Sequence, residues 1–186
     1  KKQKQMKNLK LKTVVIIALI MSITNVINAQ HDHGKMNKKQ GDHSMMDHDK
    51  SMVKLNDKNL TKAYMHYTMI KEALVEANSE KAQKASKMLA GILKKYGKAT
   101  NAQKEAEDMA SKSNIIYQRI VFSKLTTAFE PLLKDNVVEG EIYKNFCPMA
   151  NNGGSYWFSN SNKIVNPYMG EAMASCGSVK EIFKSM

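Results

Sequence analysis

Sulfur-bearing side chains are concentrated between residues 146 and 177. This segment contains both cysteines of the chain, three of its fourteen methionines, its only tryptophan and two of its three prolines. The side chains that carry the sulfur are Cys147, Met149, Met169, Met173 and Cys176. Thiolates and thioethers are soft ligands that select copper(I), silver(I) and similar ions over hard cations. The segment therefore predicts a soft-metal site, a disulfide, or a cluster that is metallated when reduced and bridged when oxidised.

A disulfide between Cys147 and Cys176 is a strong alternative to the metal site. The two cysteines enclose a loop of about 30 residues, and a bridge across such a loop stabilises a fold by roughly 3–4 kcal/mol. In the metal interpretation, Pro148 fixes the backbone between Cys147 and Met149 and pre-sets one arm of the site. Thioethers bind at any pH, whereas thiols must first lose a proton. The sequence leaves both interpretations open.

Residues 30–54 contain a second set of metal-binding side chains. The segment holds four of the five histidines and no aliphatic apolar residue before Val53, so we expect a disordered tail. His33 and Met36 are three residues apart, a spacing that places both on one side of a helical turn. The candidate ligands of the tail are His31, His33, Met36, His43, Met45, Met46 and His48. Such pairs resemble those of periplasmic silver- and copper-binding proteins, and the alternative is a polar linker.

The same three-residue spacing occurs once more, at His66 and Met69, beside Met65. This pair falls in an apolar, helical stretch. A lone histidine among methionines is more often a packing or surface feature than a ligand, because methionine commonly fills cores. His66 and Met69 are therefore the weakest of the candidate metal ligands.

Residues 1–29 have the pattern of a secretory signal peptide. Met6 looks like the natural start, and it is followed by three lysines and an apolar run over residues 14–23 that is too short to span a membrane. Ala29 supplies the small residue before a cleavage point, so we expect a mature chain from Gln30 in the periplasm or otherwise exported. The alternative is a signal segment that is not cleaved, and only in that case do we expect the chain to contact a membrane.

The net charge of +12 falls to +6 without residues 1–29, which carry six lysines and no acid. The remaining lysines are interspersed with acids, and no arginine-rich or aromatic-interleaved patch predicts nucleic acid as a partner. Hydrolase motifs such as Gly-x-Ser-x-Gly and His-Glu-x-x-His are missing, as is Cys-x-x-Cys. We therefore expect a binding protein and not an enzyme.

Apolar residues recur at helical spacing between residues 55 and 135. The pattern predicts a first helix over residues 57–77 and a second from a cap at Asn78-Ser79 to Gly97. A third helix is expected to begin at a cap at Thr100 or Asn101. A fourth follows a boundary near residues 111–114 and is expected to kink at Pro131. Short connections favour antiparallel neighbours. The prediction is a mainly α fold, an up-and-down bundle of three to four helices.

Residues 136–186 predict a small Cys/Met cap, β-hairpin in part and otherwise loop-rich. Short strands are expected at residues 142–146 and 155–159, on either side of an Asn-Asn-Gly-Gly turn. A helical turn near residues 171–175 and a last short element at residues 179–183 follow. We expect this cap to pack on the bundle, so that residues 55–186 form one domain.

The sulfur-bearing residues belong to a longer pattern that resembles a known family. The pattern consists of Phe146-Cys147-Pro148-Met149-Ala150, Trp157-Phe158-Ser159, Asn166-Pro167-Tyr168 and Cys176-Gly177, preceded by Gln118-Arg119. It is similar to an exported bacterial family of domains of unknown function, found alone or fused to membrane-fusion (adaptor) proteins of copper/silver efflux pumps. The resemblance covers about residues 57–183 and implies heavy-metal handling. Val165 and Met169 stand where that pattern has Arg and Phe.

Together, these features predict an exported protein that binds copper or silver and serves in buffering, resistance or delivery to an efflux system. The tail would collect ions weakly and the cap would hold one more tightly. The expected partners are metal ions and a metal-efflux adaptor or another envelope protein. The alternative is a non-metal structural or partner-binding periplasmic domain that is stapled by a Cys147–Cys176 disulfide.

Overall fold

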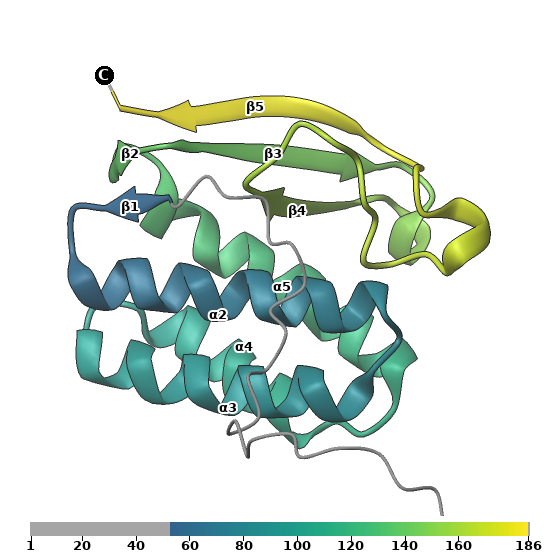
Figure 1. Ribbon diagram of the computed structural model, residues 1–186. Coiled ribbons are helices and arrows are strands. Elements are labelled where there is room, and N and C mark those ends of the chain that lie inside the picture. Colours follow the sequence, from purple (N-terminus) through teal and green to yellow (C-terminus); the bar gives the residue numbers. More distant parts are fainter. Residues whose placement is uncertain (1–52, 186) are drawn as a thin grey trace, which may run out of the picture. The chain divides into compact units, whose positions relative to one another are not determined.

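The computed structural model describes residues 53–185 (Figure 1). These residues belong to one compact unit. The expected signal peptide and all candidate ligands of the tail lie outside the described residues. Within residues 53–185, no helix is long and apolar enough to cross a membrane.

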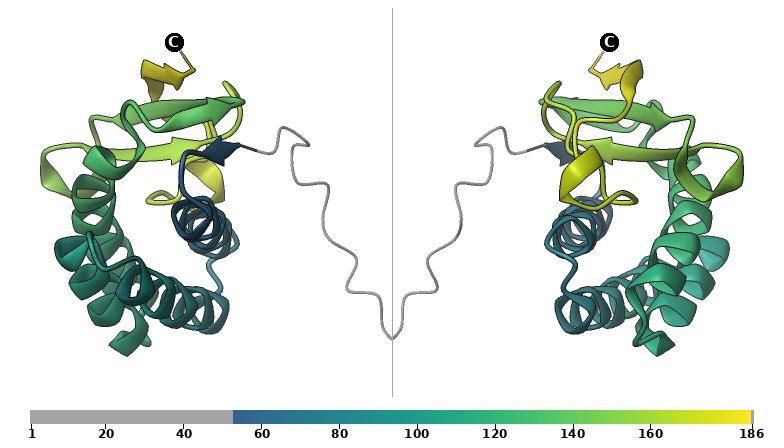
Figure 2. Two further views of the ribbon diagram at one scale, coloured as in Figure 1. Left: turned by 90° about the vertical axis from the view of Figure 1, so that its left-hand side faces the viewer. Right: turned by 90° about the vertical axis from the view of Figure 1, so that its right-hand side faces the viewer.

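Four helices form one layer of the described unit: α2 (Lys58–Val75), α3 (Ser79–Tyr96), α4 (Thr100–Ser111) and α5 (Ile115–Leu133). Viewed end-on in Figure 2, they follow one another around an arc, each packed on the next. The connections are short, so neighbouring helices run antiparallel. The predicted mainly α fold with a four-helix bundle is confirmed.

The helix boundaries follow from capping side chains. The Asp57 carboxylate accepts hydrogen bonds from the backbone N–H groups of Asn59 and Leu60, which otherwise lack helical partners. Asn78 caps α3 through the N–H of Lys81, and Gly97 ends it in the left-handed conformation. The predicted start of α4 is off by one, because Thr100 is its first helical residue and Ala99 holds the cap position without a side-chain bond.

Two antiparallel sheets complete the described unit. In the larger one, β3 (Glu141–Cys147) lies between β4 (Ser155–Ser159) and β5 (Ser178–Lys184). The smaller one pairs β1 (Lys54–Leu55) with β2 (Val137–Glu139). The strands β3 and β4 were predicted from the sequence, and the expected last element is the strand β5. The sequence analysis missed β1 and β2, because two or three residues are too few to show an alternating pattern.

The larger sheet closes the open side of the helical arc (Figure 2). Tyr67 of α2 joins the two layers: its ring stacks on Phe122 and Phe129 of α5, with centroids 5.1 and 5.2 Å away, and tilts against Phe158 of β4 at 5.8 Å. Its hydroxyl bonds to Thr126 Oγ1 at 2.7 Å and accepts the N–H of Phe158 at 3.2 Å. Aromatic packing with satisfied polar ends therefore fixes the sheet on the bundle.

Candidate functional site

The two cysteines meet at one end of the larger sheet. Cys147 is the last residue of β3, and Cys176 lies two residues before β5. Antiparallel pairing of Phe146 with Ser178 brings the two cysteines together although they are 29 positions apart. Both are free thiols with their Sγ atoms 2.7 Å apart; Cys147 is buried and Cys176 is half-buried.

The turn after Cys147 surrounds its sulfur with hydrogen-bond donors. The backbone N–H groups of Met149 and Ala150 both donate to Cys147 Sγ. Pro148 has no N–H group, so no backbone donor is left unpaired at that position of the turn. The chain then enters the one-turn 3-10 helix η1 (Ala150–Asn152), whose N-cap position is held by Met149 without a side-chain bond. Convergent N–H groups of this kind favour a negative charge on the sulfur.

Asn166 holds both cysteines. Its side chain is fully buried, donates from Nδ2 to the Cys176 carbonyl at 2.7 Å, and also bonds to Cys147 Sγ. Its Oδ1 accepts the N–H of Tyr168 at 2.8 Å, which fixes the orientation of the amide. The sequence analysis included Asn166 in the family pattern but gave it no role. The available signal, an asparagine before Pro167, indicates a turn and says nothing about a bond to sulfur.

The surroundings shift the pKa values of the two thiols in opposite directions. Burial works to raise the pKa of Cys147, but hydrogen bonds from the Cys176 thiol, from the Met149 and Ala150 N–H groups and from Asn166 outweigh burial and lower it below its usual value. The pKa of Cys176 is raised, chiefly because its thiol donates to Cys147, with burial and repulsion from the Cys147 charge adding to the effect. Cys147 is therefore the thiol of the pair that loses its proton first, and Cys176 is the one that keeps it longer.

Gly177 allows the close approach of Cys176 to β3. Its φ is +137°, and a Cβ atom there would lie 2.7 Å from the Trp157 ring and 3.0 Å from the Phe146 carbonyl oxygen. Trp157 itself is fully buried. Only glycine can therefore follow Cys176 without displacing the tryptophan or the strand.

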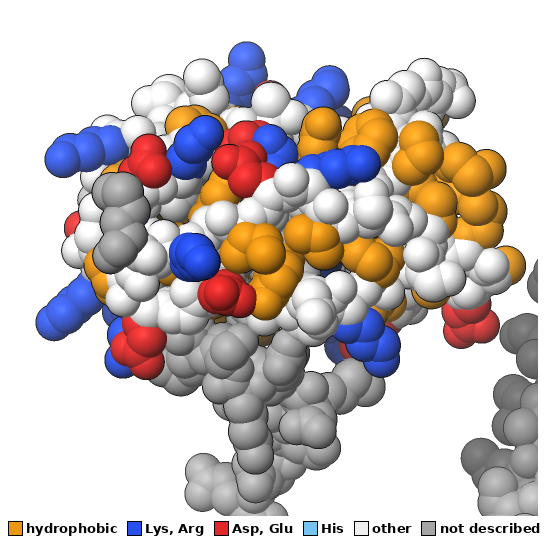
Figure 3. Space-filling view, turned by 90° about the horizontal axis from the view of Figure 1, so that it is seen from above, with side chains coloured by type: hydrophobic (Ala, Val, Ile, Leu, Met, Phe, Trp, Pro, Cys, Tyr) orange, Lys and Arg blue, Asp and Glu red, His pale blue; other side chains and the backbone are white. Residues whose placement is uncertain are grey.

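The three predicted methionine ligands contribute backbone or packing contacts. Met149 gives its N–H to Cys147, while its side chain is 61% exposed. Met173 accepts the Cys176 N–H at 3.0 Å and lies in the one-turn helix η2 (Glu171–Met173), and Met169 is half-buried against the core. Seen from the sheet side, hydrophobic side chains gather at the end of the molecule where η1 and η2 lie (Figure 3). Thioether ligation by these methionines stays a prediction.

His66 and Met69 lie on α2. His66 is half-buried, and burial lowers the pKa of its imidazole, so the ring is neutral near pH 7. Its Nδ1 is buried without a hydrogen-bond partner among residues 53–185, and Met69 is 43% exposed. A neutral imidazole can bind a metal. No group of three or more His, Cys, Asp or Glu side chains in the described part of the chain is arranged to hold an ion, so the pair stands alone.

The protein is therefore a mainly α bundle whose sheet layer carries a pair of thiols. Comparison with known protein families gives one match. The family described as protein of unknown function (DUF3347) matches residues 63–140, from α2 to the end of β2. No curated protein and no solved structure matches the chain. This region is thus similar to a family of domains of unknown function, as the sequence analysis predicted. Cys147 and Cys176 lie beyond the matched residues.

Proposed function

We propose that this protein is an exported soft-metal-binding protein whose Cys147–Cys176 pair holds one copper(I) or silver(I) ion. The observation that carries the proposal is that the fold brings the two cysteines together, with hydrogen-bond donors around the Cys147 sulfur that lower the pKa of its thiol. Two thiolates are a suitable ligand set for a soft monovalent ion. The bound ion would be buffered, kept from other targets, or passed to an efflux system through an adaptor or another envelope protein.

Binding replaces the proton that the pair shares. The two sulfurs face each other, and an incoming ion would lie between them once the proton that they share leaves. The sulfurs must then move apart, because a metal–thiolate bond is about 2.3 Å long on each side. Cys147 is buried and held by its turn, whereas Cys176 is half-buried and belongs to a loop. Cys176 is therefore the arm that moves when the ion enters.

Additional donors would come from the methionines near the pair and from the tail. Met149, Met169 and Met173 lie within a few positions of a cysteine or contact one through the backbone. The His and Met residues between His31 and His48 would collect ions at lower affinity, because the sequence has no aliphatic residues there that could order the ligands before the ion binds. The two regions together give weak capture followed by tighter holding.

A disulfide uses the same two sulfurs, so the metallated and bridged states exclude each other. The test is therefore a copper(I) titration of the fully reduced protein against a chromophoric chelator. We expect one tight equivalent that both Cys147→Ser and Cys176→Ser abolish, because a neutral hydroxyl does not replace a thiolate for a soft ion. A chain lacking residues 31–52 should lose only the weak equivalents. Tight binding that survives in both cysteine variants would exclude the thiol pair as the site.

A further inference from the structure

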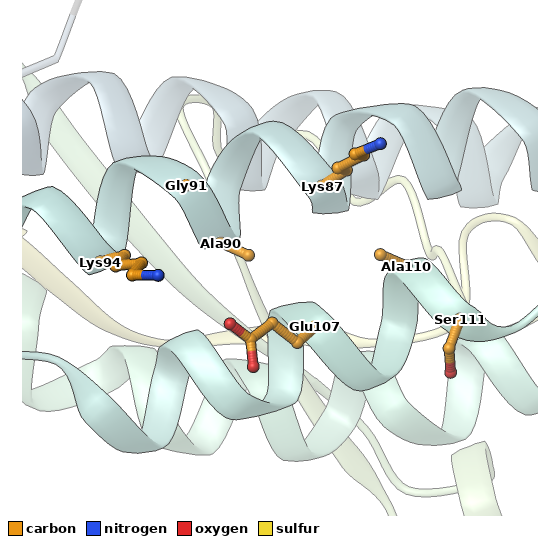
Figure 4. A pocket seen from close by; sticks show the side chains of 7 residues that line it. All are labelled: Lys87, Ala90, Gly91, Lys94, Glu107, Ala110 and Ser111. Atoms are coloured by element: carbon orange, nitrogen blue, oxygen red, sulfur yellow. The ribbon is translucent and has the colours of Figure 1, made fainter.

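A surface groove lies between the packed helices α3 and α4, on the side of the bundle away from the thiol pair. Its volume is about 420 Å³, and Figure 4 shows the side chains that line it. Small residues line its floor, namely Ala90 and Gly91 of α3 and Ala110 of α4. The α3 side carries Lys87 and Lys94, and the α4 side carries Glu107. The groove is thus apolar at its base and charged along both rims.

Gly91 keeps the groove open without being needed for the fold. A Cβ atom at this position would meet no other atom within 4 Å. Glycine is less favourable than alanine inside a helix, and no backbone requirement offsets that cost here. The missing side chain therefore leaves space for something outside the described residues to approach α3 closely.

The two rims carry opposite charge. Helix α3 has five lysines and one acid, whereas α4 has three acids and one lysine. Lys87 and Lys94 form no ion pair within the described part of the chain, and Glu107 accepts a hydrogen bond from Gln103. A partner of uniform charge would be attracted by one rim and repelled by the other. The groove suits a partner whose surface is also divided into a basic half and an acidic half.

We propose that this partner is a second copy of the chain, related by a two-fold axis that runs along the groove. Rotation about this axis places α3 of each copy over α4 of the other, so each basic helix meets an acidic one. A two-fold axis across the groove would instead set Lys87 and Lys94 of α3 against the same two lysines of the second copy. The charge pattern selects the first arrangement.

The position of Glu107 fits this arrangement. Along the groove it lies between Lys87 and Lys94 (Figure 4). Rotation about an axis parallel to the groove preserves the level of every residue along it. Glu107 of the second copy therefore arrives between Lys87 and Lys94, and the reciprocal contact forms on the other side. The open space above Gly91 lets the two helix pairs approach closely.

The interface is small, so the dimer is expected to be weak. Helix α4 has 12 residues and limits the contact to a length of about 18 Å. Interfaces at the low end of the size range give transient complexes. We expect a monomer–dimer equilibrium with a dissociation constant between roughly 10 µM and 1 mM at low salt, weakened by added salt.

Sedimentation velocity of the full chain over that concentration range tests the proposal. The wild type should dimerise, while Lys87→Glu/Lys94→Glu and Glu107→Lys should each stay monomeric because each sets like charges together. An equimolar mixture of the two variants should recover a heterodimer, since the reversed rims now face each other. Lys58→Glu/Lys62→Glu changes the net charge equally but lies on α2, and it should dimerise like the wild type.

Gly91→Leu provides a second, uncharged test. The larger side chain fills the groove and should abolish dimerisation. Gly91→Ala is the control: an unchanged circular dichroism spectrum would show that the helix tolerates substitution at this position. A wild-type chain that stays monomeric throughout the range overturns the proposal, whether the groove is empty or covered by residues 1–52. The proposal also fails if the two charge variants do not associate when mixed.

Discussion

The helical layer and the sheet layer bury different kinds of side chain. The helices bury apolar stripes almost throughout, with Ser86, Gln118 and Thr126 as their buried polar residues within the described range. The shorter sheet layer buries four polar residues, which are Asn145, Ser155, Ser159 and Asn166. Apolar burial stabilises a fold without specifying chemistry, whereas buried polar groups must be paired and so fix positions closely. The comparison indicates that stability resides mainly in the helices and the geometry of the thiol pair in the sheet layer.

The largest expected effect on the free energy of unfolding comes from a residue of the helical layer. Leu89 of α3 is fully buried, so Leu89→Ala should lower the free energy of unfolding by about 2–5 kcal/mol through lost burial and an unfilled cavity. The neighbouring Met88 is 56% exposed, and Met88→Ala should change stability by less than about 0.5 kcal/mol. Urea unfolding of the reduced protein measures both. If Leu89→Ala lowers the copper(I) affinity under conditions in which the protein stays folded, stability and the geometry of the thiol pair do not reside in different layers.

A matched pair of glycines provides the second prediction. Gly177→Ala should destabilise the protein by roughly 1–3 kcal/mol, because the residue has a positive φ and the new methyl group meets Trp157 and the Phe146 carbonyl. Gly91→Ala adds the same methyl group in open space on a helix and should stabilise by about 0.5–1 kcal/mol. Thermal unfolding distinguishes the two signs. Equal effects of the two substitutions would show that backbone strain beside Cys176 is unimportant.

The third prediction concerns the hydrogen bonds of Asn166. Asn166→Ala removes a donor from Cys147 Sγ and from the Cys176 carbonyl, so the pKa of Cys147 should rise and stability should fall by about 1–3 kcal/mol. Thiolate absorbance as a function of pH measures the first effect. In the wild type, the lowered pKa of Cys147 contributes stability that is complete above the ordinary thiol pKa and is lost as the pH falls through the lowered value. The raised pKa of Cys176 acts in the opposite sense, so its contribution disappears as the pH rises.

The smallest effect on stability is expected for Met149→Leu. The side chain is largely exposed and leucine is similar in volume and hydrophobicity, so unfolding should change by less than about 0.5 kcal/mol. The Met149 N–H that donates to Cys147 is retained. Any loss of copper(I) affinity in this variant would therefore report ligation by the thioether. An unchanged affinity would restrict the site to the two thiols.

The sequence predicted the helices better than the site. Asp57, Asn78 and Gly97 mark helix ends through interactions with their own neighbours in the chain, so their roles can be inferred from local sequence. The contact between Cys147 and Cys176 depends on the pairing of β3 with β5, which involves residues about 30 positions apart. Local patterns therefore showed two cysteines that could pair, but not the register that brings them together. The bonds from Asn166 to both of them depend on the same tertiary arrangement.

The edge position of β5 gives the thiol pair a mechanical consequence. Within the larger sheet β5 pairs only with β3, so its other side lacks a strand, and one-sided strands open locally more readily than central ones. Cys176 lies two residues before β5, and an ion or a bond joining it to Cys147 would fasten the start of that strand. A bound ion or a disulfide at the site would then slow amide hydrogen exchange along residues 178–184. A protein that samples this sheet edge could tell a loaded molecule from an empty one without touching the ion.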